Sequence, residues 1–564
     1  MSIASEITRI TDNVADAYTA AQAKGATMPA TENSDNLATT ISTIPTGGAV
    51  AEPKIMMYTV AFIDKTSLYR GNQVDLNGAD DIGDYALKHA CENGGSPTPT
   101  QYALIGTQNL TTISGQEALS NAFSGAYNVA YTGLGGITSV TGYHALYYAF
   151  TASSIQTADL GNLETAELKG YTVGGTTAYS PLEYTFNGCT SLTSADLSSF
   201  KYFVYNDSGA TAFNGFSYTF NNCSALVSVD LSSFEKFVGG DFNYTFQNCV
   251  ALTTITYDQT KIANLFATSA VRDKSFYNTF SGCTSLAVPY FIKEASGVVS
   301  FGNNTFYQMF NNCTSLASTG LSNVEVIIAT YTSTFCKTYY GCTSLTSTGL
   351  GNVRCMRCSA SATTANVAFY YMFSGCTGLT TTGLNKLALV EGKYIFYYMF
   401  SGCTGLTNET FTNLGAVYGD NSFYYMFKDC TSLVSLSFPQ LIASTLYGTS
   451  TFANMLKGCS GVTVHFPSNA QSVIGSWASV TGGFGGTNTT VLFDLPATYY
   501  IQDSNSNNLF RMPTEDTASS LAWLHSSDYG IVYTSGTSQP SVGDTIYTDS
   551  ACTVASGSTV SQII

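Results

Sequence analysis

One pattern of apolar positions recurs along most of the chain. The eleven letters FYYMFSGCTGL stand at 369–379 and again at 396–406, and looser copies lie on both sides. Aligned on the aromatic residue before the cysteine, twelve units follow one another at spacings of 26 to 36 residues. Repetition at such a period predicts one small structural unit stacked on itself. The unit centres are Phe123, Phe150, Phe186, Phe220, Phe246, Phe280, Phe310, Tyr339, Phe373, Phe400, Phe427 and Leu456.

Within each unit, the apolar positions predict a short helical turn that faces a core. The residue four positions before the centre is always Leu or Phe, and a cysteine stands three positions after the centre in ten of the twelve units. At 3.6 residues per turn these three positions fall on one side of a helix. The residues before the centres are Leu119, Leu146, Leu182, Phe216, Phe242, Phe276, Phe306, Phe335, Phe369, Phe396, Phe423 and Phe452.

After the cysteine, the pattern changes to that of a strand. LVSVDLSSF at 226–234 and LVSLSFPQL at 433–441 place apolar residues at positions 1, 4, 6 and 9. A change of period from 3.6 to 2 marks a helical turn that leads into a short strand, and strands of successive units would pair in a parallel sheet. We therefore expect an α/β solenoid of about twelve coils over residues 115–470.

The letters of the units resemble a known family of repeats. YTFNGCTSLTSADLSSF at 184–200 and FYYMFSGCTGLTTTGL at 369–384 are similar to the BspA-type leucine-rich repeats of bacterial surface proteins. The resemblance implies a leucine-rich-repeat solenoid that serves as an adhesion or recognition scaffold, without catalytic chemistry. The units here are longer and more variable than the usual family repeat, and Ala126 and the shortened FTASSI at 150–155 interrupt the cysteine column in the first two units.

The cysteines form a column that has two interpretations. Stacked neighbours could be bridged in pairs or bind a metal. No histidine accompanies them, however, so we expect small, buried, reduced thiols with no metal and no other cofactor. Cys355 and Cys358 form a CxxC without a second pair, which argues against zinc there. The column consists of Cys189, Cys223, Cys249, Cys283, Cys313, Cys342, Cys376, Cys403, Cys430 and Cys459.

A row of tyrosines is the candidate binding surface. On a helical turn, the position two before the centre points almost opposite the buried stripe, and seven of the twelve units have Tyr there. Tyr combines a flat apolar body with a polar tip, so it suits sugar faces and protein interfaces alike. The alternative is a stacked ladder that only stiffens the solenoid. The seven residues are Tyr148, Tyr184, Tyr218, Tyr244, Tyr371, Tyr398 and Tyr425.

Catalysis has little support in the sequence, and we expect no enzyme activity. Asp196 and Asp230 match in register, as a glycan-degrading tailspike would need, but the next unit has Thr256 near that column and later units have glycines. The histidines show no spacing typical of a metal site or a catalytic triad. They are His89, His144, His465 and His525.

Composition and charge narrow the range of partners. With 44% hydrophobic and 10% charged residues the chain is not of the disordered class. The net charge of −16, without any run of Lys and Arg, disfavours nucleic acid. No segment offers ~18 uninterrupted apolar residues, so we expect no membrane span. The start lacks the basic and apolar regions of a secretory signal, so we expect the chain to reach the cell exterior by another route.

Residues 1–47 predict a helical attachment segment. Apolar residues separated by 4, 3, 4, 3 and 4 positions form a heptad seam that begins with Ile3, Ile7, Ile10 and Val14. Ile at both core positions favours three or more helices, so the seam predicts a homotrimer. The alternative is packing on a second helix of the same segment, which would start near residue 33.

The segment from 5 to 45 resembles the N-terminal part of bacteriophage tail-fibre and minor virion proteins, which implies attachment to other tail proteins. We expect residues 54–114 to cap the solenoid and 471–564 to form a small β domain. Together these features predict a virion tail fibre or receptor-binding protein that recognises a host surface glycan or protein. The alternatives are a BspA-type surface adhesin and a glycan-degrading tailspike.

Overall fold

The computed structural model describes residues 73–76, 80–92, 103–105, 107–126, 129, 132–170, 177–205, 212–237, 240–267, 273–329, 333–358, 368–441, 450–472, 474 and 483–495. It also describes Val14, Ala17, Tyr18 and the backbone of the last strands, β22–β27. The chain divides into two compact units, Met1–Ile55 and Met56–Ile564. All of the strands named below belong to the second unit.

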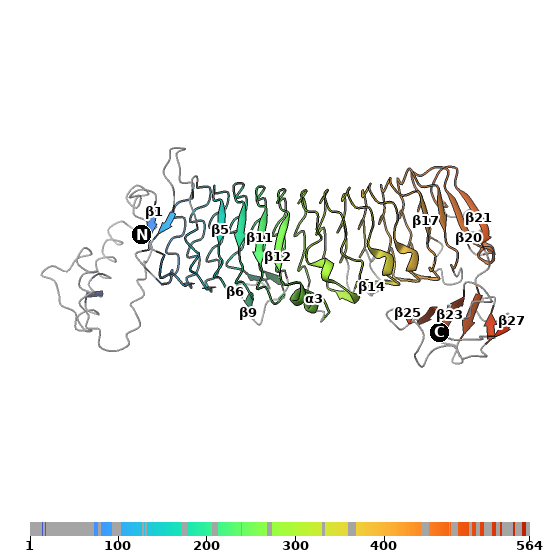
Figure 1. The fold of residues 1–564 in the computed structure, drawn as a ribbon, viewed down its shortest axis with the longest axis horizontal. Helices are drawn as coiled ribbons and strands as arrows, with labels where there is room; N and C mark the ends of the chain where they lie inside the picture. The colour runs from blue at the N-terminus through green and yellow to red at the C-terminus, as the bar shows by residue number, and fades with distance from the viewer. Residues whose placement is uncertain are drawn as a thin grey trace, which may run out of the picture. The chain divides into compact units, whose positions relative to one another are not determined.

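Short strands pair in parallel from one coil to the next, as Figure 1 shows for the part coloured from blue to orange. The first sheet contains β1 (Gln73–Asp75) and β2 (Ala103–Ile105). The second sheet contains β3 (Thr112–Ile113), β4 (Ser139–Val140), β6 (Thr165–Gly170), β7 (Thr177–Tyr179), β9 (Tyr202–Tyr205) and β10 (Ala212–Asn214). Beside them lies the sheet of β5 (Thr157–Asp159), β8 (Ser194–Asp196), β11 (Ser228–Leu231) and β12 (Thr254–Tyr257). Only the β6–β7 pair is antiparallel among these described strands.

Two more parallel sheets continue the stack, and an antiparallel sheet follows. The first contains β13 (Gly297–Phe301), β14 (Val324–Ala329), β15 (Cys355–Cys358), β16 (Leu389–Glu391) and β18 (Ala416–Tyr418). The second contains β17 (Asn408–Thr410), β19 (Ser435–Ser437), β20 (Thr463–Pro467) and β21 (Thr490–Leu495), so the parallel pairing continues to Leu495. The antiparallel sheet contains β22 (Tyr499–Gln502), β23 (Asn508–Met512), β24 (Ala522–His525), β25 (Ile531–Val532), β26 (Thr545–Tyr547) and β27 (Ala555–Thr559).

Several coils carry two strands where the sequence pattern predicts one. The coil centred on Phe400 contains β17 and then β18 before the next coil begins. In the coils centred on Phe280, Phe310, Tyr339 and Phe373, the first of the two positions has no strand. In all of these coils except that of Phe310, a 3-10 turn follows this position. The described helices are few: α3 (Gln259–Ala267), η1 (Ile292–Glu294), η2 (Leu350–Asn352), η3 (Leu384–Lys386) and η5 (Ser468–Ala470). This strand-rich parallel architecture is compatible with a leucine-rich-repeat solenoid.

The predicted helical turn around each unit centre is wrong, because the structure has consecutive β-turns there. In the coil of Phe220, the N–H of Thr219 donates to Phe216 in the same turn at 2.9 Å, whereas the N–H of Phe220 donates to Thr245 of the next coil at 3.0 Å. Backbone donors therefore alternate between their own coil and the next one. Tyr218 and Asn222 have positive φ, at 54° and 59°, which a helix does not allow.

The buried stripe predicted from the same spacing is nevertheless present. Phe216, Phe220 and Cys223 are at most 1% exposed. Consecutive β-turns with a left-handed residue at every fourth position return the chain to the same side at intervals close to those of a helix. The spacing of the apolar residues therefore identified the core correctly and the backbone incorrectly.

The core contains a continuous column of aromatic rings, one from each of the first eleven coils. Neighbouring rings have centroids 5.2 to 5.9 Å apart and are within 14° of parallel. Each buried ring stabilises its coil by roughly 1.5–3 kcal/mol through burial alone. The column consists of Phe123, Phe150, Phe186, Phe220, Phe246, Phe280, Phe310, Tyr339, Phe373, Phe400 and Phe427.

Candidate binding surface

The seven predicted tyrosines lie at the surface, partly exposed, in two stacked ladders. In the first ladder neighbouring ring centroids are 4.4 to 4.5 Å apart, and in the second they are 4.6 to 4.7 Å apart. The first ladder contains Tyr148, Tyr184, Tyr218 and Tyr244, and the second contains Tyr371, Tyr398 and Tyr425. The stacked ladder and the candidate binding face are therefore the same set of side chains.

The backbone does not require tyrosine at these positions. Each ladder residue has φ between 54° and 57°, and the same position in other coils holds Asn278, Gln308, Lys337 or Asn454, also at positive φ. A left-handed backbone excludes β-branched residues and favours Asn and Gly. Because Asn would suit this backbone better, the tyrosines owe their place to their side chains.

A second row of tyrosines was not predicted from the sequence. It stands one position earlier in the unit, where the side chains Tyr370, Tyr397 and Tyr424 are again partly exposed. The signal available in the sequence is the doublet YY in the repeated letters FYYMF. In the first part of the chain Tyr147, Tyr277 and Tyr307 hold the same position.

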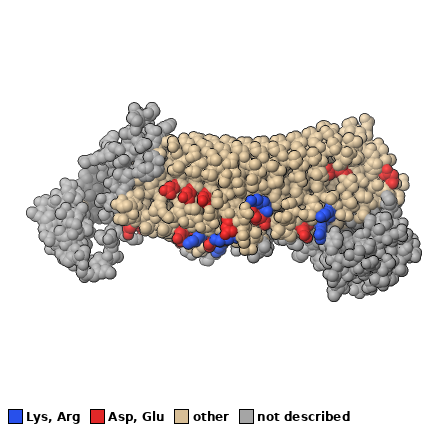
Figure 2. Space-filling model, viewed as in Figure 1, with Lys and Arg blue, Asp and Glu red and all other residues tan. Residues whose placement is uncertain are grey.

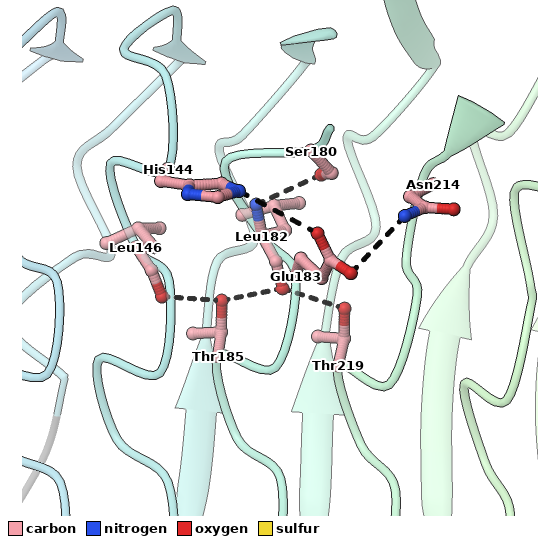
Figure 3. A network of polar contacts seen from close by, with 8 residues as sticks. All are labelled: His144, Leu146, Ser180, Leu182, Glu183, Thr185, Asn214 and Thr219. Atoms are coloured by element: carbon pink, nitrogen blue, oxygen red, sulfur yellow. Dashed lines mark hydrogen bonds and ion pairs between the residues drawn. The ribbon is translucent and has the colours of Figure 1, made fainter. Parts of the chain in front are cut away.

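A pair formed by a half-buried histidine and a buried glutamate lies beside the first ladder. Figure 3 shows Glu183 between His144 of the preceding coil and Asn214 of the following one. The Nδ2 of Asn214 donates to Glu183 Oε1 at 3.4 Å, and His144 Nε2 is 3.9 Å from Glu183 Oε2. Neither His144 Nε2 nor Glu183 Oε2 has a hydrogen-bond partner among the described residues. The histidine ring also stacks on Tyr143 and Tyr147, with centroids 4.0 and 4.2 Å away.

Burial keeps both members of this pair neutral near pH 7. It raises the pKa of Glu183 to about 8 and lowers the pKa of His144 to about 4. Glu117 and Lys88, which form an ion pair with each other, act on the pKa of His144 in opposite directions. Around the pair, side-chain hydroxyl groups donate hydrogen bonds to backbone carbonyls. Thr185 Oγ1 donates to the carbonyl of Leu182 at 2.7 Å (Figure 3).

The other predicted residues do not gather in one site. His465 Nδ1 lies 3.0 Å from both carboxylate oxygens of Asp494, and His89 contacts Glu92 at 2.7 Å. His525 belongs to β24, where only the backbone is described. Over the described ranges, no group of three metal-ligating side chains could hold an ion.

Asp196 and Asp230 are in register on neighbouring strands, and Asp159 extends the row by one strand. Asp196 Oδ1 accepts a hydrogen bond from the backbone N–H of Ser198 at 3.0 Å, and Asp230 Oδ1 accepts one from Ser232 at 2.9 Å. Each of these two carboxylates therefore closes the turn after its own strand. Figure 2 shows how sparse charged side chains are on this face, where most of the described surface is uncharged.

Each cysteine of the column is a buried free thiol that joins two coils. Its Sγ donates to the backbone carbonyl of the preceding unit centre at 2.9 to 3.1 Å. Burial raises the thiol pKa, to about 12 in Cys189. A neighbouring column of threonines also joins one coil to the next. Thr219 Oγ1, for example, donates to the carbonyl of Leu182 in the preceding coil at 2.9 Å. These hydrogen bonds were not predicted from the sequence.

Cys355 and Cys358 lie on opposite faces of β15. Cys358 belongs to the main core, whereas Cys355 packs in a second apolar cluster on the outer face, with Val326, Leu389 and Ala416 in register beside it. Residues three apart on a strand point to opposite sides, so the two thiols cannot share a metal ion.

The predicted oligomerisation seam lies largely outside the described residues. Ile3, Ile7 and Ile10 are not described, and Val14 is helical. None of the described helices is long and apolar enough to cross a membrane.

Comparisons with known proteins give little further information. No protein-family model matches the chain, and no curated protein matches it. Among solved structures, the chain is similar to that titled "Crystal structure of TLR13-ssRNA13 complex", with 12% sequence identity, 75% of this chain and 68% of that chain covered, and a TM-score of 0.14.

Proposed function

We propose that this chain is a recognition protein that binds a cell surface through its tyrosine-bearing face, and that it serves as a bacteriophage tail fibre or receptor-binding protein. The observation that carries the proposal is the pair of tyrosine ladders. They place rigid, amphipathic side chains in a regular row on a sparsely charged surface. Tyrosine loses little conformational entropy on binding and offers both apolar area and a hydrogen-bonding tip.

The mechanism is multiplied weak binding. Each coil offers a similar small contact, and a trimer built through residues 1–47 would present three such faces to one cell. Linking binding sites in this way raises the overall affinity without any new contact. The resemblance of the first residues to phage tail proteins supports attachment at that end. The partners are then other tail proteins and a host glycan or protein.

The test is adsorption of the fluorescently labelled full-length chain to a panel of bacterial cells. Saturable binding to some strains, reduced at least several-fold when Tyr397 and Tyr398 are both replaced by Ser, is the expected result. Asp196→Asn, which alters a charge on a strand instead, serves as the matched control and should bind like the original chain. Adsorption that is equal in all three proteins would contradict a role for the tyrosine face.

A BspA-type surface adhesin is the second candidate, because the repeat letters resemble that family. It would use the same face, so cell binding does not separate the two functions. Immunogold labelling with antibodies against the chain separates them, since a fibre would be found on phage tails and an adhesin on the bacterial wall.

A further inference from the structure

The coils around Tyr371, Tyr398 and Tyr425 carry the densest group of tyrosines. We call these three residues the inner ladder. Their rings are within 16° of parallel, with centroids 4.6 and 4.7 Å apart. The ring of Tyr398 therefore has both faces covered by its neighbours. The inner ladder presents ring edges and hydroxyl groups to a partner.

The row one position earlier differs in geometry. Tyr370, Tyr397 and Tyr424, which we call the outer row, are inclined to the inner ladder by 64°, 47° and 69°. Within the outer row, neighbouring rings are inclined by 32° and 35°, with centroids 4.9 and 5.4 Å apart. These rings are tilted against one another instead of stacked in parallel. Each side chain remains partly exposed.

The outer row is held in place by the side chains that pack against it. Each inner ring packs edge-on or tilted against its outer neighbour, with centroids 4.3 to 4.6 Å apart. The residues that follow the tyrosine doublets, Met372, Met399 and Met426, are fully buried. The surface therefore exists before any ligand arrives, which lowers the entropic cost of binding.

The surroundings favour a neutral ligand rich in hydroxyl groups. Lys393 is paired with Asp420 at 2.9 Å, and Lys428 is paired with Asp429. Lys337 Nζ lies over the ring of Tyr371, 5.8 Å from its centroid. Burial raises the phenol pKa of Tyr370, Tyr397 and Tyr424, so all three remain hydroxyl donors at neutral pH. A line of aromatic faces beside a line of hydroxyl groups matches a ligand whose units each have one apolar face and a polar rim.

We propose that the outer row is a binding site for a linear glycan of β-linked pyranose units, whose flat faces rest on Tyr370, Tyr397 and Tyr424 while the inner-ladder hydroxyls bond to the rim. The row runs from coil to coil, so an extended polymer can lie along it and contact one ring after another. This inference rests on the proposed function, because it names the ligand class for the same face.

The experiment titrates the full-length protein with cellohexaose and with chitohexaose, followed by calorimetry and tyrosine fluorescence. Maltohexaose, which is α-linked and curved, is the control ligand. We expect saturable binding of at least one β-linked hexasaccharide, and about tenfold weaker binding in Tyr397→Ala. Tyr397→Trp should retain it, because an aromatic face is kept. Asp196→Asn, in strand β8 and outside both rows of tyrosines, should leave it unchanged.

Several outcomes would overturn the glycan assignment. These are no saturation with either β-linked probe, equal binding of maltohexaose, or unchanged affinity in Tyr397→Ala. If Tyr397→Ala does not fold, Tyr424→Ala in the same row provides the same comparison. Cell adsorption separates this inference from the proposed function: tyrosine-dependent adsorption that protease treatment of the cells abolishes, and periodate oxidation does not, would retain recognition and replace the glycan with a protein ligand.

Discussion

At the scale of single residues, the cysteine column shows why a reactive side chain can be structural. Each thiol sits in the core, donates to a carbonyl of the preceding coil, and has a pKa raised by burial. Only a thiolate is a good nucleophile, and it must be reached by the reagent. The ten thiols therefore act as hydrogen-bond donors between coils.

This predicts that the column is inert in the native protein. Treatment with iodoacetamide at pH 8, followed by peptide mapping with mass spectrometry, should leave the ten cysteines unmodified, and prior unfolding in guanidinium should make all ten react. Rapid native labelling of Cys249 or Cys313, which are both fully buried, would contradict the buried column.

The pair His144 and Glu183 predicts a pH dependence of stability. Burial raises the pKa of Glu183 from 4.5 to about 8, so the folded protein binds more protons there and loses stability as pH rises through this window. The pKa of His144 is lowered from 6.5 to about 4, which has the opposite effect. Folding favours the neutral imidazole, so stability increases as pH rises from about 4 and reaches its full value above 6.5. The two effects oppose each other between 4.5 and 6.5.

The net loss should therefore appear between pH 6.5 and 8, and should amount to ~2 kcal/mol at about 1.4 kcal/mol per unit. Chemical denaturation followed across this range measures it. Glu183→Gln cannot ionise and should flatten the profile. Glu117→Gln, which removes the other carboxylate that acts on His144, should leave the loss in place. A wild-type profile as flat as that of Glu183→Gln would show that Glu183 is already ionised.

At the scale of the structural element, the turns around each unit centre depend on left-handed residues. Two positions before the centre this residue is often Tyr, and two positions after it is Gly, Asn or Asp in most coils. At Gly375, with φ of 75°, an added Cβ would make ordinary contacts with the backbone of Gly341 at 3.7 Å. At Gly282, with φ of 79°, an added Cβ would lie 2.3 Å from Oδ1 of Asn248. The two glycines thus separate backbone strain from steric contact.

Gly375→Ala should cost about 1 kcal/mol, the strain of a left-handed alanine. Gly282→Ala should cost more, because the side chain of Asn248 must also move. Thermal unfolding of the two variants makes the comparison, and Asn248→Gly should bring the cost of Gly282→Ala down to that of Gly375→Ala. Equal costs in the original background would argue that Asn248 relaxes freely.

The element scale also shows what the sequence could and could not predict. Leu119, Phe216 and the residues that match them recur at intervals that identify the buried stripe, and LVSVDLSSF identifies a strand that the structure places at Ser228–Leu231. The turn geometry was missed because a chain of β-turns and a helix bury residues at similar intervals. The left-handed Asn222 and Gly188, with their equivalents, were the available signal. The tilt of Tyr397 against Tyr398 depends on packing between coils, which no single unit encodes.

At the scale of the whole molecule, the heptad seam predicts assembly through residues 1–47. The mass of the full-length chain in solution should be that of a trimer, and a chain lacking residues 1–50 should be a monomer that keeps its β-rich circular dichroism. Light scattering after size-exclusion chromatography measures both. Monomers in both cases would remove the seam as an oligomerisation element and leave a single tyrosine face per particle.

Successive coils are joined by the same backbone hydrogen bonds. The N–H of Phe373 donates to the carbonyl of Met399, and the N–H of Phe400 donates to the carbonyl of Met426. Each coil therefore bonds to the next one through the same backbone groups. The identical letters at 369–379 and 396–406, 27 positions apart, fit a gene that has grown by copying one coil. Recombination could then lengthen or shorten the solenoid by whole coils. Gain or loss of one coil would change the binding face when a host alters its surface polymer.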